Sequence, residues 1–217
     1  MPTKIYAQNK RISGTIRPVL LETLGGEFTL LNGLATFVTV VDSINEWIGR
    51  VVAWLTLGCV ITCFLVVVLR YGFSIGFPWL QELYVWQHAA VFMVGAGFTM
   101  LHGGHVSVDI AYSKFGPRTK AWVDILGTLL FLLPWMGVLA WTSSQFVLSS
   151  WKILERSSTA DGMPGLYILK STIWVFCAVI SLQGIALIAR RTLFLKGRDE
   201  HSPEKVVDPI RHTAVGA

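Results

Sequence analysis

The stretch 51–69, VVAWLTLGCVITCFLVVVL, decides the fold, because it carries no charge between Arg50 and Arg70. A helix needs about 20 mainly apolar residues to cross the hydrocarbon core of a bilayer. The whole chain of 217 residues points the same way, since 53% of it is hydrophobic and only 14% is charged. An ordinary soluble domain carries roughly 25% charged residues. The stretch therefore predicts a membrane-spanning helix.

Three further stretches repeat this apolar pattern. They are 79–101, interrupted only by Glu82 and His88; 122–148, with Asp124 near one end; and 171–189. With 51–69 they predict an all-α integral membrane protein with four transmembrane helices. We expect the membrane domain to cover 43–195, after an N-terminal cytoplasmic segment (1–42) and before a mobile cytoplasmic tail (196–217).

Local signals suggest where these helices begin and bend. The apolar run 28–41 is short for a span and predicts an interfacial helix that lies on the membrane and ends at Asp42. Ser43-Ile44-Asn45-Glu46 fits a capping box that would start the first span. Pro78 suits the first turn of the second span. Pro134, inside the third, predicts a kink.

The basic residues predict how the chain crosses the membrane, because Lys and Arg accumulate on the cytoplasmic side. Of the 18 Lys and Arg residues, 14 fall on one side: four in the N-terminal segment, Arg50 at the edge of the first span, three in the connection after the second span and six at or after the end of the fourth. The other four are Arg70, Lys152, Arg156 and Lys170. Both termini should therefore be cytoplasmic. The basic charge then reads as a topology signal, and no nucleic-acid partner is expected.

The residues give no support for enzyme chemistry. Haem between facing helices needs histidines on more than one span, but His88, His102 and His105 all belong to the second span or its exit. The three cysteines lie in apolar runs without a metal-binding spacing, and no hydrolase or nucleotide-binding motif is present. We expect no catalytic residue, no cofactor and no metal in this chain.

Two charged residues within the spans each allow two interpretations. Glu82 is either an interfacial cap near the start of its helix or one half of an ion pair, with Arg70 or with a partner subunit. Asp124 is read as an interfacial carboxylate, with a functional role as the alternative. The small residues at 95–97 predict close helix packing, inside this bundle, against a second membrane protein, or both.

The first hairpin carries a more specific pattern. Leu69-Arg70-Tyr71-Gly72-Phe73, then Pro78-Trp79-Leu80-Gln81-Glu82-Leu83, then Trp86 resembles the small membrane subunit (DctQ-like) of tripartite ATP-independent periplasmic (TRAP) transporters. Gly103-Gly104-His105-Val106-Ser107-Val108-Asp109 also matches that family. The resemblance covers about residues 43–195. The chain departs from the family at Gln81, where many members have a second acid, and in its longer N-terminal segment.

The resemblance implies a transporter part in the bacterial inner membrane. A large membrane subunit would carry the substrate and sodium sites for the symport of small organic acids, and a periplasmic binding protein would deliver the substrate. The small subunit would pack beside the large one and help the binding protein to dock. The residues expected to shape the structure or the subunit interface are Arg70, Trp79, Glu82, Trp86, His105 and Asp109. The residues expected to contact the binding protein are Lys152, Glu155, Arg156 and Asp161.

Two other function classes stay open on the residues alone. The first is a four-helix membrane redox subunit, a cytochrome or quinone-linked anchor, which a bound pigment would reveal. The second is a stand-alone small channel or exporter, which would need polar residues at mid-span.

Overall fold

The computed structural model describes residues 3–104, 112 and 114–197. Every regular element in these ranges is helical, so the predicted all-α class is confirmed. The elements are α1 (Thr3–Gly72), α2 (Pro78–Val94), α3 (Ala96–Leu101), α5 (Pro117–Gly127), the π-helical turn η1 (Thr128–Leu132), α6 (Leu133–Lys152) and α7 (Leu166–Leu195).

Three helical stretches of the described chain are long and apolar enough to cross a membrane. They are Leu30–Gly72, Pro117–Lys152 and Leu166–Leu195, and they contain the predicted spans 51–69, 122–148 and 171–189. The predicted span 79–101 is instead divided between the 17 residues of α2 and the six of α3. Pro78 occupies the first turn of α2, as predicted.

The division at Gly95 is local, because backbone hydrogen bonds continue through it. The Gly95 N–H donates to the carbonyl oxygen of Val91 at 3.0 Å, and the Thr99 N–H donates to the carbonyl oxygen of Gly95 at 3.1 Å. A Cβ atom at Gly95 would lie 2.5 Å from the carbonyl oxygen of Val91 and 3.2 Å from the side chain of Val52 in α1. Glycine therefore lets this chain segment approach α1 closely, which confirms the predicted role of the small residues within the bundle.

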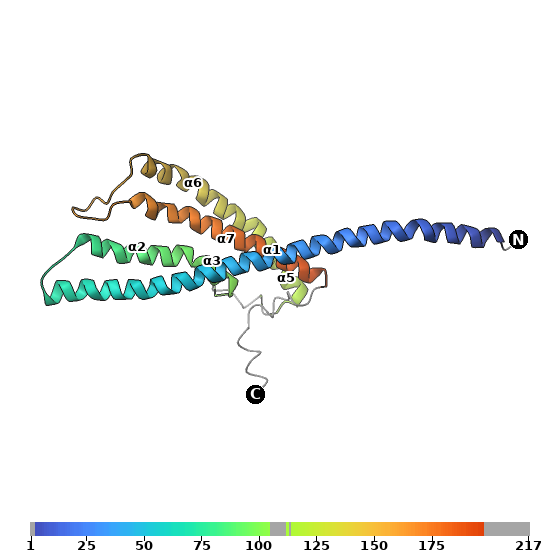
Figure 1. Ribbon diagram of the computed structural model, residues 1–217, viewed down its shortest axis with the longest axis horizontal. Helices are drawn as coiled ribbons and strands as arrows, with labels where there is room; N and C mark the ends of the chain where they lie inside the picture. Colours follow the sequence, from blue (N-terminus) through green and yellow to red (C-terminus); the bar gives the residue numbers. More distant parts are fainter. Residues whose placement is uncertain (1–2, 105–111, 113, 198–217) are drawn as a thin grey trace, which may run out of the picture.

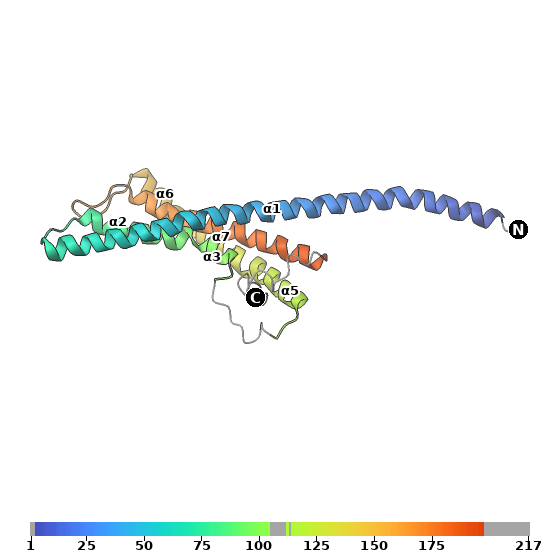
Figure 2. The same cartoon turned by 60° about the horizontal axis from the view of Figure 1, so that its bottom comes forward.

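α1 runs unbroken from Thr3 to Gly72, so the predicted helix start at Ser43 is wrong. The Ser43 hydroxyl donates to the carbonyl oxygen of Thr39, as serines inside helices do. Asp42 does not end the helix, because Arg190 of α7 pairs with its carboxylate. The separate interfacial helix predicted over 28–41 is part of α1. At 1.5 Å per residue α1 is about 105 Å long, and its N-terminal part projects beyond the other helices (Figures 1 and 2).

α7 is the centre of the bundle, and it contacts α1, α2, α3, α5, η1 and α6. Met136, Cys177 and Ile180 form a buried apolar cluster between α6 and α7. The connections 73–77 and 153–165 lie at one end of the bundle, here called the loop end (Figure 1). The last residues of α3 and α7 and the first of α5 lie at the opposite end, here called the tail end.

Pro134 is accommodated by a change of helix type. It lies in the first turn of α6, directly after η1. Proline cannot donate to the preceding turn, and its ring crowds the carbonyl four residues earlier. In η1 the chain widens by one residue, and the Leu133 N–H donates to the carbonyl oxygen of Thr128. The strain expected at Pro134 thus appears as a π-helical turn, a feature often found where helices line a site.

Candidate functional site

Glu82, Ser157 and Met163 form a group at the loop end that we call the loop clamp. The Ser157 hydroxyl donates to Oε1 of Glu82, and the Met163 N–H donates to Oε2 at 2.7 Å. Glu82 belongs to α2, whereas both donors belong to the connection 153–165. One carboxylate therefore ties this connection to a helix that lies some 80 positions earlier in the chain.

Gly162 is required by the close approach of backbone and carboxylate in this clamp. A Cβ atom there would lie 2.8 Å from Oε1 of Glu82 and 2.6 Å from the side chain of Ser157. The connection also contains Leu154 and Asp161 in the left-handed backbone region, at φ of 46° and 62°. The connection thus follows a tight, defined path.

A second tie at the loop end is the ion pair between Glu155 and Lys170. Lys170, near the start of α7, donates to Oε2 of Glu155 and lies 4.0 Å from the centre of the Phe146 ring. Because this ammonium favours the ionised carboxylate, the pKa of Glu155 lies below its ordinary value. The connection 153–165 is therefore held at both α2 and α7.

The predicted intrachain ion pair between Arg70 and Glu82 does not form. Both residues are described, and Glu82 is instead engaged in the loop clamp, beyond the first turn of α2. Arg70 is exposed and borders a small crevice with residues of the connection 73–77. Its predicted role at a subunit interface stays a prediction.

The remaining residues predicted at interfaces differ in exposure. Trp79 is exposed and lies beside Phe77, whereas Trp86 is half-buried near Gly165. Lys152, Arg156 and Asp161 are exposed around the connection 153–165, and Glu155 is engaged with Lys170. His105, Asp109 and the predicted tail, apart from Lys196 and Gly197, lie outside the described residues.

Two buried ion pairs at the tail end were not predicted from the sequence. Nη2 of Arg190 donates to Asp42 of α1, and Nε of Arg191 donates to Oδ2 of Asp124 in α5 at 2.7 Å. The side chains of Arg190 and Arg191 are only 7% and 5% exposed. Adjacent arginines of α7 thus hold two different helices.

A layer of amides extends the first ion pair into the bundle. Nδ2 of Asn45 donates to Oε1 of Gln183 at 2.6 Å, and Nε2 of Gln183 donates to Oδ1 of Asp42 at 3.3 Å. Asn45 and Gln183 are both buried. Buried polar groups carry a large desolvation cost unless they are paired, so this network fixes how α1 packs on α7.

These pairs were missed because their members are far apart in the sequence. Asp42 and Arg190 are separated by 148 positions. One feature of the sequence could have indicated these pairs. Three apolar stretches each have a charged residue at the same end, and buried charges in membrane proteins pair with one another. From the sequence alone, Arg190 and Arg191 indicate only the topology.

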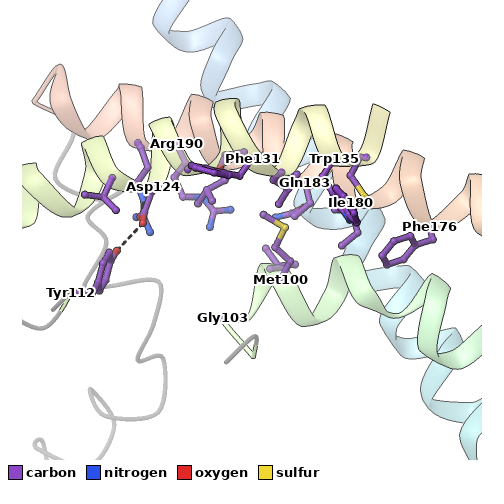
Figure 3. Close-up of a pocket in the computed structure, with 18 residues that line it drawn as sticks. Met100, Gly103, Tyr112, Asp124, Phe131, Trp135, Phe176, Ile180, Gln183 and Arg190 are labelled. Atoms are coloured by element: carbon purple, nitrogen blue, oxygen red, sulfur yellow. Dashed lines mark hydrogen bonds and ion pairs between the residues drawn. The ribbon is translucent and has the colours of Figure 1, made fainter. Parts of the chain in front are cut away.

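A groove of about 880 Å³ lies over α7, between α3 on one side and η1 and α6 on the other. Its apolar part is lined by Met100, Phe131, Trp135, Met136, Phe176 and Ile180. Its polar part, at the tail end, contains Tyr112, Asp124, Gln183, Arg190 and Arg191. Figure 3 shows side chains from three parts of the chain bordering this common space, with the Tyr112 hydroxyl donating to Asp124 at 2.9 Å.

Metal binding has no support in the part of the chain that the structure describes, where no three His, Cys, Asp or Glu side chains gather. The carboxylates of Asp42 and Asp124 are already engaged by arginines. The polar chemistry of these sites therefore serves helix packing and loop anchoring.

Apolar helices of membrane-crossing length, joined by internal ion pairs, define an integral membrane protein. Residues 58–193 match the family model described as "Tripartite ATP-independent periplasmic transporters, DctQ component". The match covers more than half of the chain, so the protein belongs to this family of TRAP transporter small membrane subunits. No curated protein and no solved structure matches the chain. Because the family is a transporter component and not an enzyme family, the redox alternative gains nothing from this match.

Proposed function

We propose that this chain is a non-catalytic scaffold that packs beside the large, substrate-translocating subunit of its transporter and stabilises it in the bacterial inner membrane. In this arrangement the chain crosses the membrane four times, with α2 and α3 together forming the second crossing. Both termini are cytoplasmic, and the loop end faces the periplasm. The substrate, a small organic acid, and the coupling ion bind to the large subunit.

The observation that carries the scaffold proposal is the internal pairing of charges at the tail end. Asp42 and Asp124 are neutralised by Arg190 and Arg191 of the same chain, so these acids are not free to bind a translocated ion. Asp124 lines the groove over α7, but its carboxylate is occupied there by Arg191 and Tyr112. Pairs that join α1 and α5 to α7 serve rigidity instead.

The outward surface supports lateral packing in the membrane. Trp54 and Phe64 of α1 are 75% and 68% exposed, and Trp141 of α6 is 81% exposed. Large exposed apolar areas mark contact with lipid or with another membrane protein. A family whose members belong to a three-part transporter supplies such a protein in its large subunit.

Uptake by purified components tests the scaffold proposal. Proteoliposomes that contain the large subunit and receive the binding protein should take up substrate when this chain is present. Uptake should fall to background when the chain is left out, and adding the chain back should restore it. Full uptake without the chain would contradict the proposal.

We further propose that the connection 153–165 helps the periplasmic binding protein to dock. Lys152, Arg156 and Asp161 are exposed there, and the loop clamp fixes the path of the chain that carries them. Charges on a fixed loop steer a soluble partner and mainly change its association rate.

The docking proposal is tested by reversing a charge at this loop. The Arg156→Glu variant should raise the concentration of binding protein needed for half-maximal uptake, while the yield of the membrane complex stays unchanged. Arg118→Glu, an exposed arginine at the tail end, is the matched control and should have no effect. Equal behaviour of the two variants would rule out docking at this loop.

A further inference from the structure

We propose that the groove over α7 is a binding site for one anionic phospholipid, with the acyl chain along the apolar part and the headgroup phosphate at Arg191. The order of the lining is the basis for this assignment. Aromatic and aliphatic side chains occupy one part, and two arginines, the Asp124 carboxylate, the Gln183 amide and the Tyr112 hydroxyl occupy the tail end (Figure 3). A phospholipid has the same order of apolar and charged parts.

The position of the polar part across the membrane matches the level of the lipid headgroups. Lys170 and Arg190 stand 20 residues apart on α7, a distance of about 30 Å at 1.5 Å per residue. This equals the thickness of the hydrocarbon core. If Lys170 marks one face of that core, Arg190 and Arg191 lie at the headgroup level of the other.

The length of the groove fits an acyl chain and not a small anion. Along α7 it extends from Arg191 to Phe176, about 22 Å at the helical rise. One leaflet contributes about 15 Å of hydrocarbon, half of the core. The apolar lining therefore follows a chain through a whole leaflet, whereas an inorganic phosphate would use only the polar end.

The charge at the tail end favours an anionic partner. Arg191 has a second nitrogen, Nη1, that is buried and has no hydrogen-bond partner among the described residues. The segments 114–124 and 190–197 contain six basic residues, of which Arg190 and Arg191 are paired with Asp42 and Asp124. The six are Lys114, Arg118, Lys120, Arg190, Arg191 and Lys196. Basic pockets between helices on the cytoplasmic side are typical sites for anionic headgroups.

Gly127 offers a way to fill the groove without disturbing the fold. It lines the groove with helical backbone angles, and a Cβ atom there would meet nothing within 4 Å. Gly137 of α6 is equally open but does not line the groove. Gly127→Leu therefore obstructs the site, and Gly137→Leu is a matched control.

Native mass spectrometry of the full chain, delipidated in detergent, tests the proposal. We expect one phosphatidylglycerol per chain, bound at least tenfold more tightly than phosphatidylcholine with the same acyl chains. Gly127→Leu should weaken this binding at least tenfold, whereas Gly137→Leu should bind as the parent does. Thermal unfolding of both variants verifies that they are folded.

Three results would overturn the lipid site. They are equal binding of the two lipids, unchanged binding by Gly127→Leu, and competition by inorganic phosphate at millimolar concentration, which would indicate a small-anion site. Release of the lipid when the large subunit is added would show that a partner helix takes the groove, and would also reject the proposal. The scaffold function does not depend on any of these results.

Discussion

Asp124 and Arg191 form an ion pair whose loss should be costly, because the arginine side chain is only 5% exposed. Removing one member of a buried pair leaves an uncompensated charge, at about 3–5 kcal/mol. Asp124→Asn should therefore lower the free energy of unfolding by several kcal/mol. Unfolding by sodium dodecyl sulfate, followed by circular dichroism, measures this quantity.

The control for Asp124→Asn is another acid-to-amide change at a helical ion pair. Glu46 lies 3.4 Å from Arg50, one turn along α1, and 3.4 Å from Nε2 of His102, and the side chains of these two partners are 76% and 44% exposed. Exposed pairs at this spacing contribute about 0.3–0.5 kcal/mol, so Glu46→Gln should change stability little. Equal losses in the two variants would contradict the structural role of the buried pair.

Glu82 accepts two hydrogen bonds in the loop clamp, and its amide analogue lacks the charge that strengthens both. A glutamine can accept from the Met163 N–H and donate its NH₂ group to the Ser157 oxygen, but both bonds are then between neutral groups. Hydrogen bonds to a charged group contribute about 1.5–3 kcal/mol. Glu82→Gln should therefore raise the tryptic cleavage rate after Arg156 about tenfold or more.

Cleavage after Arg156 needs a control within the same connection. Asp161→Asn makes the same chemical change at an exposed residue, and asparagine tolerates the left-handed backbone at this position. Its cleavage rate should match that of the parent chain. A Glu82→Gln chain that is cleaved no faster than Asp161→Asn would argue against the clamp.

Helix packing at the level of elements depends on Gly97 of α3. A Cβ atom there would lie 2.3 Å from Val179 of α7 and 2.4 Å from Oδ1 of Asn45 in α1. Three helices meet at this glycine, and overpacking costs about 1–3 kcal/mol. Gly97→Ala should lower the thermal unfolding temperature of the chain.

The opposite change in unfolding temperature is expected for alanine at Gly33 of α1, where a Cβ atom meets nothing within 4 Å. Alanine is favoured over glycine inside a helix by about 0.5–1 kcal/mol. Gly33→Ala should therefore keep or raise the unfolding temperature. A decrease of similar size at both glycines would mean that the close packing around Gly97 is not the cause.

The anchoring of the connection 153–165 to α7 should depend on pH through Glu155. Its folded pKa lies below the ordinary value of 4.5, because Lys170 donates to the carboxylate. The pair therefore stabilises the folded state fully above pH 4.5, and this contribution is lost as the pH falls through the lowered pKa. NMR titration of ¹³C-carboxyl-labelled glutamate measures this pKa. Lys170→Met should move it back toward 4.5, and an unchanged titration would contradict the pairing.

Sequence reasoning located the apolar helices well, because length and hydropathy are local properties. The stretches 51–69 and 171–189 each lie inside one long helix, and 122–148 lies inside the continuous helical stretch of α5, η1 and α6. It failed at the start of the first span, where Ser43 was taken for a helix cap. Asp42 and Ser43 lie in the interior of α1, and the acid is paired with Arg190, 148 positions away. Local patterns cannot report such a partner.

The candidate sites were only partly predictable for the same reason. For Glu82 the sequence allows an interfacial cap or an ion pair, and it does not point to Ser157 or Met163, which lie far along the chain and carry no distinctive motif. The groove was not predicted at all, because its lining comes from α3, α5, η1, α6 and α7. The family, in contrast, was identified from short motifs, and the family match over 58–193 confirms it.

At the scale of the whole molecule, the chain combines an interior whose helices are joined by ion pairs with an apolar exterior. α7 joins the other helices through ion pairs at the tail end and through the connection 153–165 at the loop end. The N-terminal part of α1 projects beyond this bundle (Figure 2). This organisation suits a protein that presents fixed apolar surfaces to partner subunits.

Co-purification tests this account most directly. The tagged full chain, expressed with its native partners and extracted in mild detergent, is analysed by size exclusion and mass spectrometry. The account predicts a stoichiometric complex with one large membrane subunit of about a dozen spans, as the family resemblance implies. A lone, monodisperse chain recovered under conditions that keep the large subunit folded would contradict it.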